Sequence, residues 1–286
     1  MSKICRDDDT VNPARTRPDI RPAGLPIRRS RIRRASAGLS PVRAGAAFVM
    51  VVAALAVYGV GNSSAFVYRS LELDAGPSPY TTRDVVLTSL GLNDAAPNLF
   101  LMRTDRLETG LLALPAVLEA DVSVSLPDTI RVRIVEREPI VVWNVAGHRF
   151  LVDRTGSLFA PAVTGGPGDG LPFVTDRRAT SAAFDVGGHL DPVDLDAATR
   201  MASLVPRDIG SAASELRVVV DDTDGYQLRP VGVPWVAVFG VYTPSIRTPE
   251  LIPGQVRLLR SFLAGRELTV KRILLADDRN GTYVSR

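Results

Sequence analysis

The side chains that could do chemistry are few in this sequence. The two histidines, His148 and His189, each lie beside glycine in stretches that we predict to be strand or loop edges. Neither has a serine partner in the G-x-S-x-G pattern that exposes a catalytic nucleophile, because Ser157 stands in Thr-Gly-Ser-Leu. We therefore expect both histidines at the surface and no acyl-transfer site.

Paired carboxylates would be the other route to hydrolysis. Glu136 and Glu138 alternate with Arg137 at the end of a predicted strand. A glycosidase needs two carboxyl groups facing one bond, whereas this alternation favours residues that are solvated or paired with Arg131 and Arg133. If the protein were an enzyme, a membrane-tethered cell-wall hydrolase would be the first class to consider, but the sequence contains no set of catalytic residues for one.

Cofactor and metal sites are not indicated either. The aspartates at 221–224 lack the spacing and the terminal Glu of a calcium loop and are typical of a hairpin turn. The glycine-rich stretch 161–170 lacks Gly-Lys-Ser/Thr and a following helix, so we expect a flexible loop rather than a phosphate site. Cys5 is the only cysteine, which excludes an internal disulfide and a Cys/His metal site. We predict no catalytic residue, no cofactor, no metal, no small-molecule substrate and no enzymatic activity.

The distribution of charge says more than the net charge of +3. Residues 1–43 carry 11 Lys and Arg against 4 Asp, a formal charge of +7, and the rest of the chain carries −4. Such a tail could bind nucleic acid or could flank a membrane span. It is rich in Pro and Arg, so we expect it to be disordered and attracted to anionic lipid headgroups.

The residues after the tail favour the second interpretation, a membrane span, and we predict no nucleic-acid partner. No charged residue occurs from Ala44 to Tyr68, and about 20 apolar residues suffice to cross about 30 Å of hydrocarbon. We predict a transmembrane signal-anchor helix at 44–65. The basic residues precede it, so the positive-inside rule places the N-terminus in the cytoplasm and the C-terminus outside it.

Two alternatives compete with an uncleaved anchor. A buried core helix would need polar residues on a solvent face, and nothing polar interrupts this run. A cleaved signal peptide could use the small residues Ser63, Ser64 and Ala65. Signal peptides, however, have a short basic region and an apolar region of about 7–15 residues. Here the region before the span is 1–43, which is much longer. The anchor is the favoured interpretation.

The elements after the span alternate in a simple order over 66–138. We expect a strand near 66–74, a helix that starts at Thr81/Thr82, and a second helix with Asp105 as N-cap and Glu108 at the capping-box position. Two strands of period-two pattern follow, at 120–126 and 130–135, on either side of a Pro127-Asp128 turn. The order predicts an α+β domain with two helices on a three-stranded sheet.

The remainder, 139–286, is predicted to be a mixed, β-rich domain. Helices are expected at 194–204 and 253–263, and strands at 216–220, 225–229, 235–241, 270–275 and 282–284. The last two strands are joined through 277–281, where Asn280-Gly281 is a strong hairpin signal.

Motifs in the middle of the chain give this order a family likeness. They are Leu114-Pro115, Ala120-Asp121-Val122, Leu126-Pro127-Asp128-Thr129, Glu136-Arg137-Glu138-Pro139, Trp143, and the Asp153 to Gly156 turn between two strands. The sequence resembles the FtsQ/DivIB family of bacterial cell-division proteins. The resemblance implies a cytoplasmic tail at 1–43, a span at 44–65, a POTRA domain (strand, two helices, two strands) at 66–138 and a β-rich domain at 139–286.

The resemblance also implies a non-enzymatic function in septation. Family members act as scaffolds in the division septum of the plasma (inner) membrane, where they hold partners near the septal peptidoglycan synthases. Exposed sheet edges accept partner strands, and the family implies that the terminal strands receive FtsB, which pairs with FtsL. The candidate partner-binding residues are Arg217, Arg279, Asn280, Gly281, Thr282, Tyr283 and Val284.

One rival belongs to another class of binding protein. A POTRA protein of secretion or outer-membrane assembly would show repeated POTRA units or an attached barrel, and the sequence predicts neither.

Overall fold

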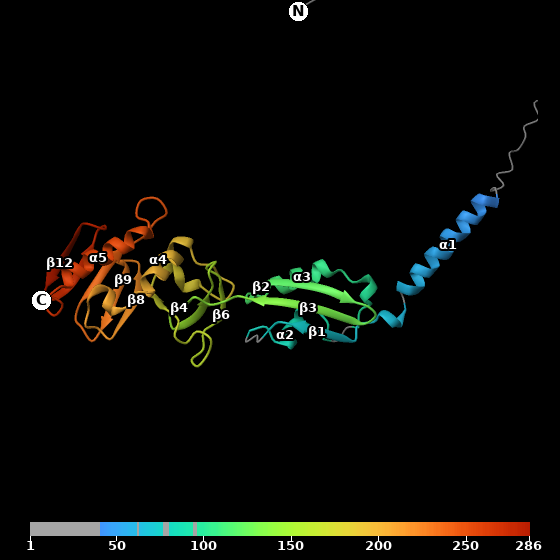
Figure 1. Cartoon of the computed structure of the whole chain (residues 1–286), viewed down its shortest axis with the longest axis horizontal. Coiled ribbons are helices and arrows are strands. Elements are labelled where there is room, and N and C mark those ends of the chain that lie inside the picture. The colour runs from blue at the N-terminus through green and yellow to red at the C-terminus, as the bar shows by residue number, and fades with distance from the viewer. Residues whose placement is uncertain (1–40, 62, 77–79, 94–95) are drawn as a thin grey trace, which may run out of the picture. The chain divides into compact units, whose positions relative to one another are not determined.

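The computed structural model describes residues 41–61, 63–76, 80–93 and 96–286 (Figure 1). The predicted tail therefore lies outside the described residues, apart from its last three positions. Helix α1 spans Pro41–Gly61. It is the one helix of the described part that is long and apolar enough to cross a bilayer, over Ala44–Gly61 with a mean hydropathy of 2.1. Its large apolar side chains are exposed, Phe48 and Leu55 among them, as a lipid-facing helix requires.

The first domain contains three strands and two helices in the predicted order. The strands are β1 (Ser70–Asp74), β2 (Val117–Ser125) and β3 (Thr129–Glu136), and the helices are α2 (Arg83–Ser89) and α3 (Thr104–Leu112). The sheet order is β1-β3-β2, with β1 parallel and β2 antiparallel to the central β3. One face of this sheet packs on Val86 of α2 and Leu111 of α3, so the predicted POTRA-type arrangement is confirmed.

The start of α3 differs from the prediction. The helix begins at Thr104, and its N-cap position is Arg103, which makes no side-chain cap. Asp105 lies in the first turn and pairs with Arg103 at 3.5 Å. Glu108 does not close a capping box, because its Oε1 accepts a hydrogen bond from the Val122 amide of β2 at 3.1 Å. The carboxylate thus joins helix to sheet.

The second domain is built on one nine-stranded sheet in the order β12-β11-β10-β9-β8-β7-β4-β5-β6. The strands are β4 (Val141–Val145), β5 (His148–Val152), β6 (Leu158–Pro161), β7 (Phe173–Asp176), β8 (Glu215–Asp221), β9 (Gly225–Val231), β10 (Val236–Gly240), β11 (Val270–Leu275) and β12 (Gly281–Ser285). The helices α4 (Pro192–Ala202) and α5 (Ile252–Leu263) complete it.

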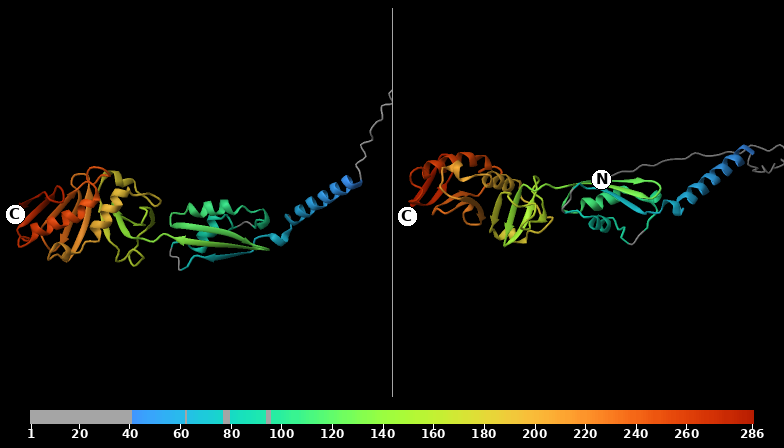
Figure 2. Two further views of the ribbon diagram at one scale, coloured as in Figure 1. Left: turned by 45° about the horizontal axis from the view of Figure 1, so that its top comes forward. Right: turned by 60° about the horizontal axis from the view of Figure 1, so that its bottom comes forward.

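Both helices cover the same face of this sheet (Figures 1 and 2). Met201 of α4 and Leu259 of α5 pack with Trp143, Tyr226 and Ile273 in one large core. Helix α5 is the crossover between the parallel strands β10 and β11. The opposite face carries a smaller cluster over β4, β5 and β6, made by Val142, Leu151, Phe159 and Ala160.

The predicted helices and strands of this domain are confirmed, with shifts of one to two residues at their ends. α4 begins earlier than predicted because Asp191 caps it and Pro192 starts its first turn. The sequence pattern missed β4 and β7 as separate strands. Both are short and central, and both faces of β4 are buried, so no alternation of polar and apolar residues marks it.

Three of the motifs quoted above meet where the first domain ends. Arg137 donates from Nη1 to Asp153 Oδ2 at 2.6 Å and from Nε to the carbonyl of Pro115 at 3.0 Å. Asp153 Oδ1 in turn accepts from the amides of Thr155 and Ser157, both at 2.9 Å. These motifs therefore have a structural role, because their polar side chains order the backbone where the first domain ends.

Candidate partner-binding edge

Strand β12 forms one edge of the nine-stranded sheet, and its only strand neighbour in the described part of the chain is β11. Figure 2 shows this strand and the C-terminus at one end of the sheet. Thr282, Tyr283, Val284 and Ser285 are all exposed. An uncovered edge strand is the feature by which sheets accept a further strand.

The register tells which backbone groups of β12 are available. The amides of Ala276 and Arg286 donate to Asn280 and Thr269, so the even-numbered residues 280 and 286 engage the β11 side. Residues of an antiparallel strand alternate in this respect. The N–H and C=O groups of Gly281, Tyr283 and Ser285 therefore point toward the open edge.

The other edge of the sheet is protected. Strand β6 ends in Pro161, which has no amide hydrogen to offer. Its outer side is covered by a loop, because the Leu158 amide donates to Gly188 O at 2.9 Å and the Gly187 amide donates to Leu158 O at 2.7 Å. A proline and a covering loop of this kind resist strand addition. Strand β12 contains no proline, and within the described residues no loop forms a backbone hydrogen bond to its outer side.

The turn before β12 is built by one carboxylate. Asp277 accepts hydrogen bonds from the amides of Arg279 and Asn280 at 2.7 and 2.6 Å, and from Asn280 Nδ2 at 2.7 Å. These bonds, the one from the Asn280 side chain first, hold the pKa of Asp277 below its usual value. The predicted hairpin is present, but an aspartate side chain shapes its turn, and Gly281 is already the first residue of β12.

Gly281 is required by space. A Cβ at this position would lie 2.8 Å from Leu274 O and 2.9 Å from Phe262 Cε2. The glycine thus lets the hairpin approach both its own partner strand and helix α5. Tyr283 lies on the α5 side as well, with its ring 5.6 Å from that of Phe262 and the Arg266 guanidinium 5.8 Å from its centre.

Arg217 lies on β8, four strands away from β12, and its side chain pairs with Glu215 at 3.3 Å. The registers nevertheless place it in one cross-strand row, which runs through Arg217, Arg229, Val236, Arg272 and Val284 if the Ala237–Leu228 register of β10 and β9 is continued by one residue. This row, which we call the basic row, lies on the sheet face opposite the helices. At about 4.8 Å per strand it extends roughly 19 Å.

The structure thus brings 279–284 together in one hairpin and connects Arg217 to it only through the basic row. Sequence reasoning missed Arg229 and Arg272. Both follow the alternation of their strands, in which Tyr226, Leu228 and Ile273 face the core, and that alternation could have identified them.

The groups considered for chemistry are dispersed. His148 and His189 are both exposed, as predicted. Glu138 is exposed, and Arg131 pairs with Glu72 at 2.6 Å. Among the described residues, no three His, Cys, Asp or Glu side chains lie close enough to hold a metal ion.

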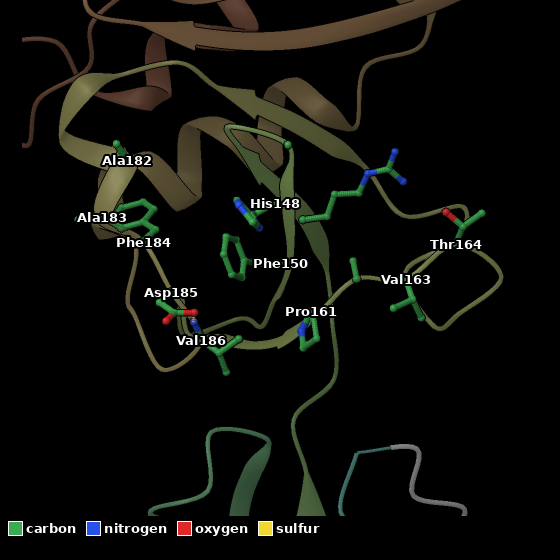
Figure 3. Close-up of a pocket in the computed structure, with 13 residues that line it drawn as sticks. His148, Phe150, Pro161, Val163, Thr164, Ala182, Ala183, Phe184, Asp185 and Val186 are labelled. Carbon is green, nitrogen blue, oxygen red and sulfur yellow. Dashed lines mark hydrogen bonds between the residues drawn. The ribbon is translucent and has the colours of Figure 1, made fainter.

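A hollow of about 860 Å³ lies beside His148 (Figure 3). It is lined by the β4–β5 turn, the loop after β6 and the segment 182–186. Figure 3 shows His148 next to Phe150, with Val163 and Thr164 on the loop away from Ala183. Its lining, all within the described residues, includes no serine or cysteine, and no hydrogen bond joins His148 to Asp185. The only hydroxyl in this lining is that of Thr164, which lies on the loop away from Ala183.

Comparison with known proteins agrees with the fold. The family model described as "POTRA domain, FtsQ-type" matches residues 75–137. The chain is 27% identical over 247 residues to the cell division protein FtsQ of Chloroflexus aurantiacus, covering 86% of this chain and 80% of the relative. FtsQ of Chloroflexus aggregans matches to the same extent. FtsQ of Bartonella bacilliformis is 35% identical over 98 residues, which is 34% of this chain and 31% of that protein. The resemblance to the FtsQ/DivIB family is confirmed, and an FtsQ-type POTRA domain precedes the β-rich sheet.

Proposed function

We propose that this chain is a non-catalytic scaffold of bacterial cell division, which recruits partner proteins and holds them at the septum through strand-edge contacts. The observation that best supports this proposal is the difference between the two edges of the nine-stranded sheet, since the β6 edge is capped and the β12 edge is open. The likeness to cell-division proteins supplies the biological setting.

A partner strand would pair with the outward-facing backbone of Gly281, Tyr283 and Ser285. Main-chain hydrogen bonds would supply affinity, and the exposed side chains of β12 would supply specificity. Arg279, Asn280, Thr282 and Val284 are the flanking contacts in this proposal, since they belong to the same hairpin.

Arg217 would take part through the basic row. A partner that continues from the β12 edge across the open face meets Arg272, Arg229 and then Arg217 in register order. Acidic side chains at matching intervals would complement these guanidinium groups. Partners of the FtsB/FtsL type, which in turn hold the septal peptidoglycan synthases, are the proposed occupants.

The membrane arrangement follows from charge and hydropathy. We propose a single pass with 1–43 in the cytoplasm, the anchor at 44–65, a POTRA domain at 66–138 and the β-rich domain at 139–286, the last two outside the cytoplasm. The +7 charge of the tail favours this direction because basic residues are retained on the cytoplasmic side.

Depletion of the protein in its own cells tests the proposal. Cells that lose it should elongate without septa, and expression of the full chain should restore division. Normal cell length and normal septation after depletion would contradict the function as a division scaffold.

A further inference from the structure

Large apolar side chains are exposed at the end of the first domain nearest to the chain's exit from α1. Leu101 is 65% exposed, Leu126 is 52% exposed and Phe100 is 47% exposed. Together with Phe66, whose ring lies 6.0 Å from that of Phe100, we call these residues the tip. Single exposed apolar residues are ordinary, but several gathered at one end mark a contact surface.

Three segments meet at the tip through backbone hydrogen bonds. The Tyr68 amide donates to Pro97 O at 3.0 Å, and the Arg69 amide donates to Asp128 O at 3.0 Å. An isolated bridge joins Val67 to Asn98. The loop that carries Phe100 and Leu101 and the turn that carries Leu126 are therefore both fixed to the segment that leaves the helix.

That segment keeps the tip close to the last residue of α1. Asn98 Nδ2 donates to the carbonyl of Gly61 at 2.5 Å, and Phe66 follows Gly61 by only five positions. A chain extends at most about 3.6 Å per residue, and the headgroup layer is about 5–8 Å thick on each side of the hydrocarbon. If α1 spans a bilayer, Phe100 and Leu101 lie at the headgroup layer where it ends.

The charges around the tip fit a lipid surface. Arg69 and Arg103 flank it with side chains 66% and 64% exposed. Their carboxylate partners Asp128 and Asp105 lie 3.9 and 3.5 Å away, with side chains 29% and 67% exposed. Aromatic and leucine side chains with neighbouring arginines are the pattern of interfacial membrane contact.

We propose that the tip inserts Phe100 and Leu101, with Leu126 beside them, into the headgroup layer on the side where α1 ends. The occupant of this apolar surface is lipid. The inference rests on the membrane span of the proposed function. Beyond that span, we infer that the first domain contacts the lipid surface directly and is not separated from it by a free linker.

The test uses the full chain with Cys5→Ser, which removes the only cysteine, reconstituted in vesicles of phosphatidylcholine and phosphatidylglycerol. Leu101→Cys carries an environment-sensitive NBD fluorophore, which is quenched either by doxyl-labelled lipid or by aqueous iodide. Leu55→Cys within α1 reports insertion of the helix. Val163→Cys, 62% exposed on the loop after β6, is the matched surface control.

The proposal predicts that the label at 101 is quenched by doxyl lipid, is shielded from iodide, and emits at shorter wavelength than the label at 163. Adding Phe100→Ser and Leu126→Ser should reduce that lipid quenching. The inference is overturned if the label at 101 behaves like the one at 163, or if protein shields it from both quenchers. If the label at 55 is still quenched by lipid in that case, the membrane span stands and only the contact of the tip with lipid is wrong. Loss of lipid quenching at 55 as well would overturn both the span and the inference.

Discussion

At the scale of single residues, the edge depends on two positions of the last hairpin. Asp277 fixes the turn through its hydrogen bonds to the amides of Arg279 and Asn280. Gly281 allows the close approach of β12 to Leu274 and Phe262. Asp277 acts only by positioning the hairpin, whereas Gly281 also presents its own backbone groups to the open edge.

The first prediction concerns Gly281→Val. The added side chain overlaps the Leu274 carbonyl and the ring edge of the partly buried Phe262, so we expect a loss of about 1–3 kcal/mol in the free energy of unfolding. Urea unfolding of the full chain in detergent, followed by the fluorescence of the buried Trp143 and Trp235, measures it. Thr282→Val on the same strand is the control and should change stability little. Equal stability of the two variants would contradict the packing described for Gly281.

At the scale of elements, one sheet has two edges of opposite character. β6 ends in proline and is covered by a loop, whereas β12 is exposed from Thr282 to Ser285. Exposed edges risk aggregation, so an uncapped edge agrees with the partner binding that we propose.

The second prediction separates the backbone of β12 from its side chains. Tyr283→Ala removes the ring but keeps an outward N–H, and Tyr283→Pro removes that N–H as well. We expect the proline variant to capture partner proteins at least about tenfold more weakly than the alanine variant, because one edge hydrogen bond is lost and the ring clashes with an incoming strand. Co-purification of the full chains from cells measures this difference. Equal capture would argue against strand addition at this position.

The third prediction concerns the basic row. Arg217→Glu reverses an exposed charge and should weaken partner binding about two- to tenfold, with a larger effect at low salt. Arg154→Glu makes the same charge change at an exposed position of the β5–β6 turn and should have no effect. Binding measured between about 50 and 300 mM salt distinguishes the two. Identical behaviour of the two variants would remove the basic row from the interface.

At the scale of the whole molecule, a buried polar network holds the β-rich domain together. Asp176 accepts from Trp143 Nε1 at 3.2 Å and from Ser181 Oγ at 2.6 Å, and Arg178 bridges it to Asp194. Burial alone would raise the pKa of Asp176, but the hydrogen bonds from Arg178 and Ser181 outweigh burial and lower it. Burial acts against the charge of Arg178 too, and the two carboxylates outweigh it.

The fourth prediction follows from the sign of that shift. A carboxyl whose pKa is lower in the folded state adds stability above its unfolded pKa of about 3.9, and the contribution is lost as pH falls through the folded value. We expect the free energy of unfolding to decline below about pH 4. Asp176→Asn should cost about 3–5 kcal/mol at pH 7, because it leaves Arg178 underpaired, and should flatten the decline. Urea unfolding at pH 7, 5 and 3 measures this. A variant that keeps the full acid dependence would contradict the assignment to Asp176.

Much of this architecture could be predicted because its signals are local. Apolar length predicts α1, and alternation predicts β2, β3 and β11, the last with its observed ends Val270–Leu275. The order of the domains was predicted from the resemblance to the FtsQ/DivIB family. Their boundaries, and the partner-binding set from Arg217 to Val284, stay predictions.

The parts that sequence reasoning missed depend on pairing between distant segments. Strand β7 joins β4 and β8 in parallel, and no local pattern encodes those neighbours. Placing Arg217 in line with Val284 requires four successive strand registers. The protection of the β6 edge likewise depends on where the loop after Asp185 folds back.

The most direct test of the central claim is site-specific photo-cross-linking from position 283 in dividing cells. A photoreactive amino acid in place of Tyr283 should trap a membrane protein of the division machinery, and mass spectrometry should place the link in an extended segment of it. The same probe at Val163, exposed on the loop beside the capped β6 edge, should not trap that partner. Recovery of the same partner from both positions, or of none from 283 while the variant still supports division, would contradict binding at the β12 edge.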